Sequence, residues 1–119
     1  LHAKTAAMIA SERFSLSTDI CNAIYWHTTG KPAMSPFEIV IYLADYIEEF
    51  REDASCVKLR EFYKKALSKE LDKSIALNKT LVRSFDTTIK HLIAEEQTIC
   101  KDTFEARNYY IDQLRAFNF

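Results

Sequence analysis

The sequence is poor in the residues that break helices. Its 119 residues include one glycine and two prolines, so few positions force a turn and long helices are favoured. Its three cysteines, Cys21, Cys56 and Cys100, lie far apart and show neither a zinc-binding spacing nor an even-numbered disulfide framework. Such isolated thiols are typical of a reducing compartment, so the sequence predicts a cytoplasmic protein.

Net charge and long apolar runs are also lacking. The 16 basic and 17 acidic residues give a formal net charge of −1, which offers no general attraction to nucleic acid or to an anionic membrane. No apolar stretch approaches the length that a bilayer-spanning helix requires. We therefore expect no nucleic-acid partner and no membrane partner. The 48% of hydrophobic and 28% of charged residues are instead typical of a folded globular domain.

What the sequence does contain is hydrophobic residues at helical spacing, which predicts an all-α protein. The fifth of the predicted helices is either one long helix or two helices that break near Ser84. The expected helices run from His2 to about Glu12, from a cap at Ser17 or Thr18 to Thr28–Gly30, from Pro36 to about Glu49, from about Cys56 to Leu67, from Glu70 to about Glu96, and from Asp102 to about Ala116.

Three short segments indicate where helices end and begin. Gly30 suits a left-handed C-terminal cap. In Ser35–Glu38, the serine hydroxyl can accept the glutamate's N–H and the glutamate can reach back, while a proline occupies the first helical position. Asp102 and the glutamate three positions later repeat this logic, so we expect Asp102 to cap the last helix.

Asp45 is the residue most open to chemistry. It lies in a helix that is apolar nearly all round, which predicts a position at the centre of a bundle. A charged carboxylate is expensive there unless it forms an ion pair, caps another helix or binds a metal. His27 fits a hydrogen bond to a carbonyl equally well, and His2 and His91 fit solvated side chains. Eighteen positions separate His27 from Asp45, so only the fold could bring the two together.

Four blocks of sequence carry a resemblance to a known family. Tyr25–Glu38 contains HTTGKPAMSPFE, Ile41–Glu48 reads IYLADYIE, Leu1–Ala3 reads LHA and Asp102–Asn108 reads DTFEARN. In kind and in order they resemble blocks of the HD-domain superfamily, and within it the YqeK-type symmetrical dinucleoside tetraphosphatases. The blocks cover the chain nearly end to end, and the joint occurrence of the first two is specific.

This resemblance implies an HD-type helical bundle with two metal ions that hydrolyses diadenosine tetraphosphate into two ADP by metal-activated water. Iron is the expected metal, with manganese or another divalent ion as the alternative. The metal ligands that the resemblance implies are His2, His27 and Asp45, of which His27 and Asp45 are also the implied catalytic residues. The residues it implies for nucleotide binding are Thr28, Arg51, Asp102, Thr103, Phe104, Glu105, Ala106, Arg107 and Asn108.

Part of the family pattern is not matched. The family has a further histidine and a His-Asp pair, but the only histidines here are His2, His27 and His91. We therefore expect residues 1–119 to be the C-terminal part of a single HD-type domain, with further residues upstream of Leu1. Glu49–Phe50 also replaces the proline and small polar residue that the family has before its loop arginine, so the reach of that arginine to phosphate is open.

Two rival interpretations stay open. The chain could be a non-catalytic helical interaction module, either a degenerate HD domain or a fragment that forms a homodimer through an exposed apolar face. It could also be an HD phosphohydrolase that acts on another nucleotide. For Arg51, a solvated charge at a helix C-terminus is the simpler role. For Arg107, no acidic residue stands one helical turn away to form an ion pair.

Overall fold

The computed structural model describes residues 2–48 and 50–117. Within these residues the regular secondary structure consists of helices alone, joined by turns and short loops. The all-α prediction is therefore confirmed, and the fifth predicted helix is one continuous helix. Leu1 and Glu49, on which two of the expectations above rest, lie outside the described residues. The helices are α1 (His2–Phe14), α2 (Thr18–Trp26), α3 (Pro36–Ile47), α4 (Ala54–Lys69), α5 (Lys73–Ala94) and α6 (Lys101–Phe117).

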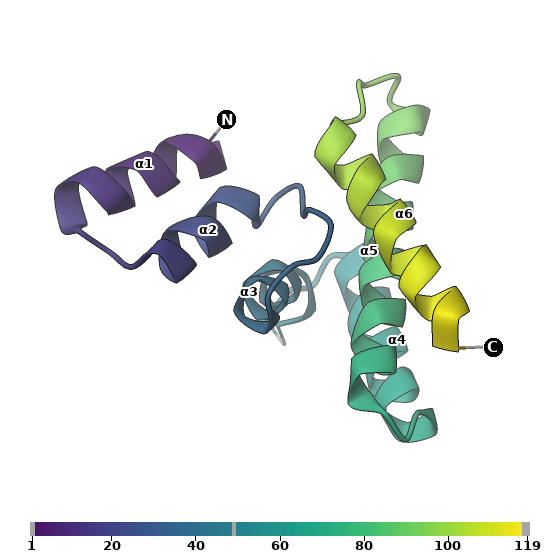
Figure 1. The fold of residues 1–119 in the computed structure, drawn as a ribbon. Helices are drawn as coiled ribbons and strands as arrows, with labels where there is room; N and C mark the ends of the chain where they lie inside the picture. The colour runs from purple at the N-terminus through teal and green to yellow at the C-terminus, as the bar shows by residue number, and fades with distance from the viewer. Residues whose placement is uncertain (1, 49, 118–119) are drawn as a thin grey trace.

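The helices form two groups with α3 between them (Figure 1). On one side, α1 and α2 run antiparallel, and the small buried residues Ala3, Ala7 and Ala10 line the face of α1 that packs closely on α2. On the other side, α4, α5 and α6 follow one another as antiparallel neighbours. Since α3 packs against both α2 and α4, it connects the two groups.

The hydrophobic core lies where α3, α5 and α6 meet. Phe85 of α5 is fully buried, and its ring centroid lies 5.2 Å from that of Tyr42 and 6.4 Å from that of Tyr110. Burial raises the pKa of Tyr42 far above its ordinary value, and its hydroxyl lies 3.3 Å from the Ser84 hydroxyl. The remaining buried members of this cluster are Met34, Leu43, Leu81, Val82 and Ala106.

The predicted starts of α2 and α3 are confirmed, but α2 ends at Trp26, ahead of the expected Thr28–Gly30, and α5 begins at Lys73, three positions after the expected Glu70. Ser17 caps α2, and Ser35 and Glu38 form the complete capping box at the start of α3. Gly30 adopts the left-handed conformation, with φ of 71°. The prediction for Asp102 is wrong, because α6 already begins at Lys101 and Asp102 therefore lies within its first turn.

The expectation that α3 lies at the centre of a bundle is also wrong. Phe37 and Val40 are 43% and 56% exposed, and the Asp45 side chain is half exposed. The physical reason is that the described part of the chain covers only the sides of α3 that face α2, α4 and the core. No described helix is long and apolar enough to cross a membrane.

Candidate active site

The loop between α2 and α3 is held in place by the last helix. The Thr103 hydroxyl of α6 donates a hydrogen bond to the Thr29 carbonyl at 2.9 Å. Two helical turns further on, the Tyr110 hydroxyl accepts the Met34 N–H at 2.9 Å, and burial raises the pKa of Tyr110 to about 12. Because both contacts join residues more than seventy positions apart, the conformation of this loop depends on the tertiary fold.

Gly30 lets this loop approach the core closely. A Cβ atom built on Gly30 would lie 2.7 Å from Cε1 of Phe85 and 3.6 Å from the Cβ of Ala106. Its φ of +71° is also a conformation that residues with a side chain rarely adopt. Glycine is therefore required here both by the backbone and by the space available.

Replacing Gly30 with alanine is expected to lower the free energy of unfolding by roughly 2–4 kcal/mol, since left-handed strain adds to overpacking against Phe85. Urea unfolding followed by circular dichroism measures this cost. Ala33→Gly is the matched control, because Ala33 in the same loop has φ of 53° but is exposed. That variant is expected to be neutral or to gain up to roughly 1 kcal/mol. Equal effects of the two changes would contradict this account of Gly30.

His27 caps the C-terminal end of α2 with its imidazole in a fixed orientation. Its Nδ1 lies 2.6 Å from the carbonyl oxygen of Ile24, so Nδ1 carries the proton and donates it. The lone pair is then on Nε2, which points away from this contact. A histidine held in this way presents Nε2 as a ligand, and the carbonyl contact is the arrangement common among metal-binding histidines.

His27 and Asp45 line the same open pocket, of about 440 Å³. Asp45 lies in the last turn of α3. Ile41, Ala44 and Asp45 recur at helical spacing, so they share one face of α3, and this face lines the pocket. Arg51, from the loop after α3, closes one side. The other residues that line the pocket are Ile41, Ala44 and Glu48.

Asp45 forms an ion pair within this pocket. Arg51 Nη2 lies 3.0 Å from Asp45 Oδ1, with both side chains about half exposed. A pair with this exposure contributes roughly 0–1 kcal/mol to stability, so a ligand can displace it at little cost. Arg60 of α4 holds the loop after α3 in place, because it donates hydrogen bonds to the carbonyls of Glu48 at 2.8 Å and Arg51 at 3.3 Å.

Two of these residues, Glu48 and Arg60, were not predicted from the sequence as part of the site. Glu48 follows Asp45 by three positions and is the residue that caps the C-terminal end of α3. The helical period predicts one face for both, so that spacing could have found it. Arg60 gives no such signal, because it acts on backbone carbonyls of a loop that only the fold brings near α4.

A three-ligand metal cluster is not formed by the described residues. No group of three or more His, Cys, Asp or Glu side chains between positions 2 and 117, position 49 aside, converges in a way that could hold a metal ion. His2 is exposed in the first turn of α1 and does not complete a group with His27 and Asp45. The structure therefore brings two of the three expected ligands to one pocket.

The residues expected to bind nucleotide divide into exposed and buried side chains. Thr28 is exposed next to His27, and Phe104 and Asn108 are exposed on α6, as is Glu105, which forms an ion pair with Lys101. Thr103 and Ala106 are buried, so their side chains hold α6 against the loop and the core. Asp102 is half-buried and accepts a hydrogen bond from the Cys100 thiol.

Arg107 also has a structural partner. Its Nε lies 2.9 Å from Asp86 Oδ1 on α5. The sequence showed no acidic residue one helical turn away, but the fold supplies one from the neighbouring helix. Each side chain of the pair is about one-third exposed, so the outer edge of the guanidinium stays open to solvent.

Comparison with solved structures identifies the class of protein. The chain superimposes with a TM-score of 0.80 on the crystal structure of a predicted HD superfamily hydrolase from Clostridium acetobutylicum, described as involved in NAD metabolism. The two are 40% identical, over 95% of this chain and 55% of the other. The described helices therefore have the fold of part of an HD superfamily hydrolase.

Relatives found by sequence indicate a particular kind of protein within this class. The chain is 32% identical over 111 residues to the symmetrical bis(5'-nucleosyl)-tetraphosphatase of Bacillus subtilis, covering 92% of this chain and 54% of the relative. It is 35% identical over 109 residues to the enzyme of the same name from Halalkalibacterium halodurans, covering 91% and 53%. No family model matches the chain. The resemblance found in the sequence is thus confirmed, and the chain spans about half the length of the curated relatives it matches.

Proposed function

We propose that this chain is part of a metal-dependent phosphohydrolase that cleaves diadenosine tetraphosphate symmetrically into two ADP. The relatives that bear this activity in their names match the chain along nearly its whole length. Residues 1–119 would then be the C-terminal part of one HD-type domain, with the rest of the site in the portion of the relatives that this chain does not span.

One observation carries the proposal. An oriented imidazole, a carboxylate and a guanidinium, from His27, Asp45 and Arg51, line one pocket that is open to solvent. These are the group types that phosphoryl transfer requires, namely ligands for a metal ion and a cation for the phosphate oxygens. The first two come from different helix ends, and packing of α2 on α3 brings them together.

The donor chemistry fits a divalent metal in part. Imidazole nitrogen and carboxylate oxygen suit iron, manganese or zinc, and the Ile24 carbonyl holds the His27 ring for ligation. Catalytic sites generally use at least three protein ligands, so this pair needs further donors. The resemblance supplies His2, which does not join the pair in this structure, and the histidine and His-Asp pair of the family pattern upstream of Leu1. When bound, such an ion would lower the pKa of a water molecule and polarise a phosphoryl oxygen.

The other residues of the pocket would hold the nucleotide. The planar guanidinium of Arg51 can bind two phosphate oxygens at once. Arg51 can exchange Asp45 for the phosphate at little cost in free energy, because the ion pair of Arg51 with Asp45 is half exposed. Thr28 is exposed beside His27. Thr103 joins α6 to Thr29 of the loop after α2. Phe104, the next residue, and Asn108, one turn later, are exposed on α6, and they would contact ribose and base.

Diadenosine tetraphosphate turnover tests the proposal directly. The protein, extended to the length of its relatives and stripped of metal, is expected to be inactive and to regain activity on addition of Fe²⁺ or Mn²⁺. Chromatography is expected to show ADP as the sole product. ATP and AMP together would indicate asymmetrical cleavage, and no turnover across a panel of nucleotides would overturn the assignment.

The rival function is a non-catalytic helical interaction module. It is favoured by the two-ligand set described above and by large exposed apolar side chains such as Met8, Phe14 and Val40. Metal content separates the two ideas, because an interaction module should purify without stoichiometric transition metal. Size-exclusion chromatography would show whether it forms a homodimer.

A further inference from the structure

A groove lies between α4 and α5, and none of the site residues assigned above line it. It contains two hollows, of about 280 Å³ and about 400 Å³. Ser55, Leu59 and Thr87 line both of them, and Ser55 and Thr87 are exposed, so the two hollows are adjacent at the surface along the same pair of helices. Small-molecule sites occupy roughly 300–1,000 Å³, and the groove is therefore large enough for a metabolite.

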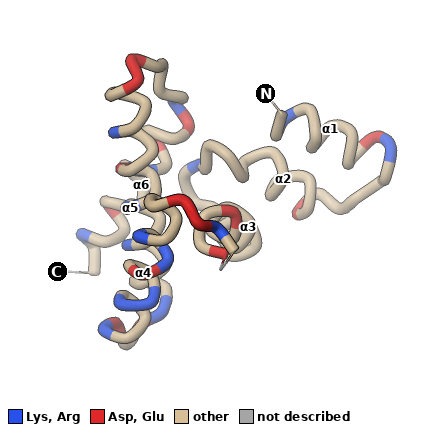
Figure 2. The backbone as a smooth tube through the Cα atoms, turned by 180° about the vertical axis from the view of Figure 1, so that it is seen from behind, with Lys and Arg blue, Asp and Glu red and all other residues tan. Residues whose placement is uncertain are grey.

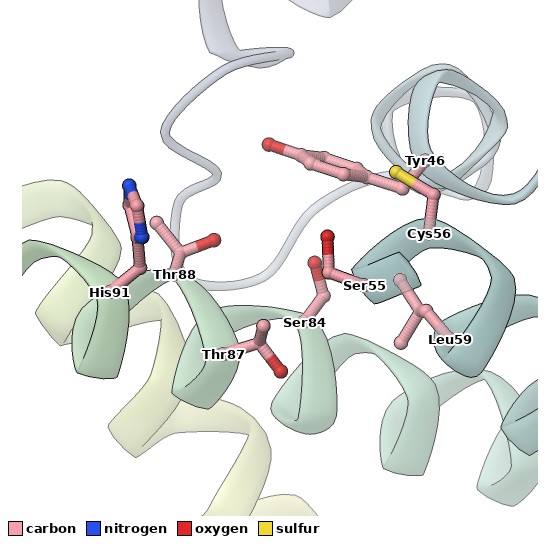
Figure 3. A pocket seen from close by; sticks show the side chains of 8 residues that line it. All are labelled: Tyr46, Ser55, Cys56, Leu59, Ser84, Thr87, Thr88 and His91. Carbon is pink, nitrogen blue, oxygen red and sulfur yellow. The ribbon is translucent and has the colours of Figure 1, made fainter. Parts of the chain in front are cut away.

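One end of the groove is uncharged and rich in hydrogen-bonding groups (Figure 3). Tyr46 reaches over it from α3, with its hydroxyl directed toward the side where Thr88 and His91 stand on α5. The Tyr46 phenol is a neutral hydrogen-bonding group near pH 7, because the ordinary pKa of a tyrosine is about 10. Leu59 supplies an apolar surface, and no Lys, Arg, Asp or Glu lines this end among the described residues.

The other end of the groove is cationic. Lys58 of α4 and Arg83 of α5 line it, and no carboxylate does among the residues that the structure describes. Neither cation forms an ion pair with any described side chain. The Arg83 guanidinium lies over the Phe62 ring, 5.2 Å from its centroid, so its face is occupied while the N–H groups at its edge stay available for an anion.

The surroundings strengthen this charge. Residues 54–69 of α4 include five lysines and arginines against one acidic residue, Glu61. Figure 2 shows these basic positions gathered along α4. Helix α4 therefore has a net positive charge although the whole chain has a net charge of −1, and this charge would favour an anionic ligand beside Lys58 and Arg83.

We propose that the α4–α5 groove is a second small-molecule site, which binds a ligand that joins one anionic group to an uncharged polar ring system, the class of nucleoside monophosphates. The phosphate would lie between Lys58 and Arg83, and the nucleoside would occupy the end lined by Tyr46, Thr88 and His91. This site is separate from the pocket of His27 and Asp45, since the two share no lining residue.

Calorimetric titration with AMP tests the site in the 119-residue chain. AMP is expected to bind more tightly than adenosine or inorganic phosphate, and more weakly as salt is raised. The double change Lys58→Ala and Arg83→Ala is expected to weaken AMP binding at least tenfold. Thr88→Leu, which fills the uncharged end, is expected to weaken AMP and adenosine alike but to leave phosphate binding unchanged.

The control for charge is Lys64→Ala with Lys69→Ala, which removes two exposed cations of α4 that line neither hollow. AMP affinity should then stay within about twofold, and circular dichroism checks that every variant folds. His27→Ala separates this site from the active site, because it should leave AMP binding intact. Binding that is lost in His27→Ala but kept in the Lys58 and Arg83 variant, or no AMP binding at all, would overturn the inference and leave the proposed hydrolysis untouched.

Discussion

Replacing His27 or Asp45 with alanine is expected to abolish turnover of diadenosine tetraphosphate in the extended, metal-loaded protein. The rate should fall by roughly 10²–10⁴-fold, the range for loss of a positioned catalytic side chain. Metal content should fall with it, because each change removes a ligand from the shared pocket. Stability should change little, since Asp45 is half exposed and its ion pair with Arg51 contributes roughly 0–1 kcal/mol.

Asp112→Ala serves as the matched control for this prediction, because it removes an exposed carboxylate from α6. Asp112 does not line the pocket of His27, so this variant should keep turnover and metal content. If His27→Ala or Asp45→Ala stays active, the assignment of the site is refuted. If activity is lost while metal content is kept, the residue acts on the substrate and not as a ligand.

Phe85→Ala is expected to be the most destabilising single change, with a cost of roughly 3–5 kcal/mol in the free energy of unfolding. Phe85 has no exposed surface, packs between Tyr42 and Tyr110, and supports Gly30. Urea unfolding measures the cost. Phe104→Ala is the control, because that ring is 52% exposed and its loss should change stability by less than about 0.5 kcal/mol.

A double-mutant cycle with Gly30→Ala would show that the two residues are coupled. The alanine methyl group at Gly30 would enter the space that Phe85→Ala vacates, so the overpacking part of its cost should disappear. The strain of the left-handed backbone should persist. Additive costs would mean that the Gly30 loop does not rest on the Phe85 ring.

The parts of the fold that local chemistry decides were predictable. The capping box of Ser35 and Glu38 and the left-handed Gly30 depend on residues within one turn of each other, and the structure confirms both. The start of α6 was mispredicted at Asp102. The Phe104 N–H bonds to the Cys100 carbonyl, which starts the helix before Asp102, and the Asp102 carboxylate accepts the Cys100 thiol.

The exposure of α3 and the partner of Arg107 could not be predicted. Apolar residues all round α3 indicate burial only if other helices cover every face, and the described residues leave Phe37 and Val40 uncovered. The acidic partner of Arg107 is Asp86, 21 positions earlier on a different helix. A pattern read along one helix cannot find such a partner.

For the candidate site, the residue types were predictable but their grouping was not. Spacing alone left His27 and Asp45 unconnected, and the family resemblance suggested that they meet. In the structure they line one pocket, while the expected third ligand, His2, does not complete a cluster with them. The contribution of Arg60, which positions the loop of Arg51 through carbonyl contacts, depends wholly on tertiary geometry.

The two contacts that α6 makes with the loop after α2 have a consequence for synthesis and for genetic damage. The carbonyl of Thr29 and the N–H of Met34 obtain their partners only after Thr103 and Tyr110 have been translated. The loop beside His27 therefore reaches its final shape only after residue 110 has been translated. A premature stop codon ahead of Thr103 would spare every codon for His27, Asp45 and Arg51, yet remove both contacts that hold the loop.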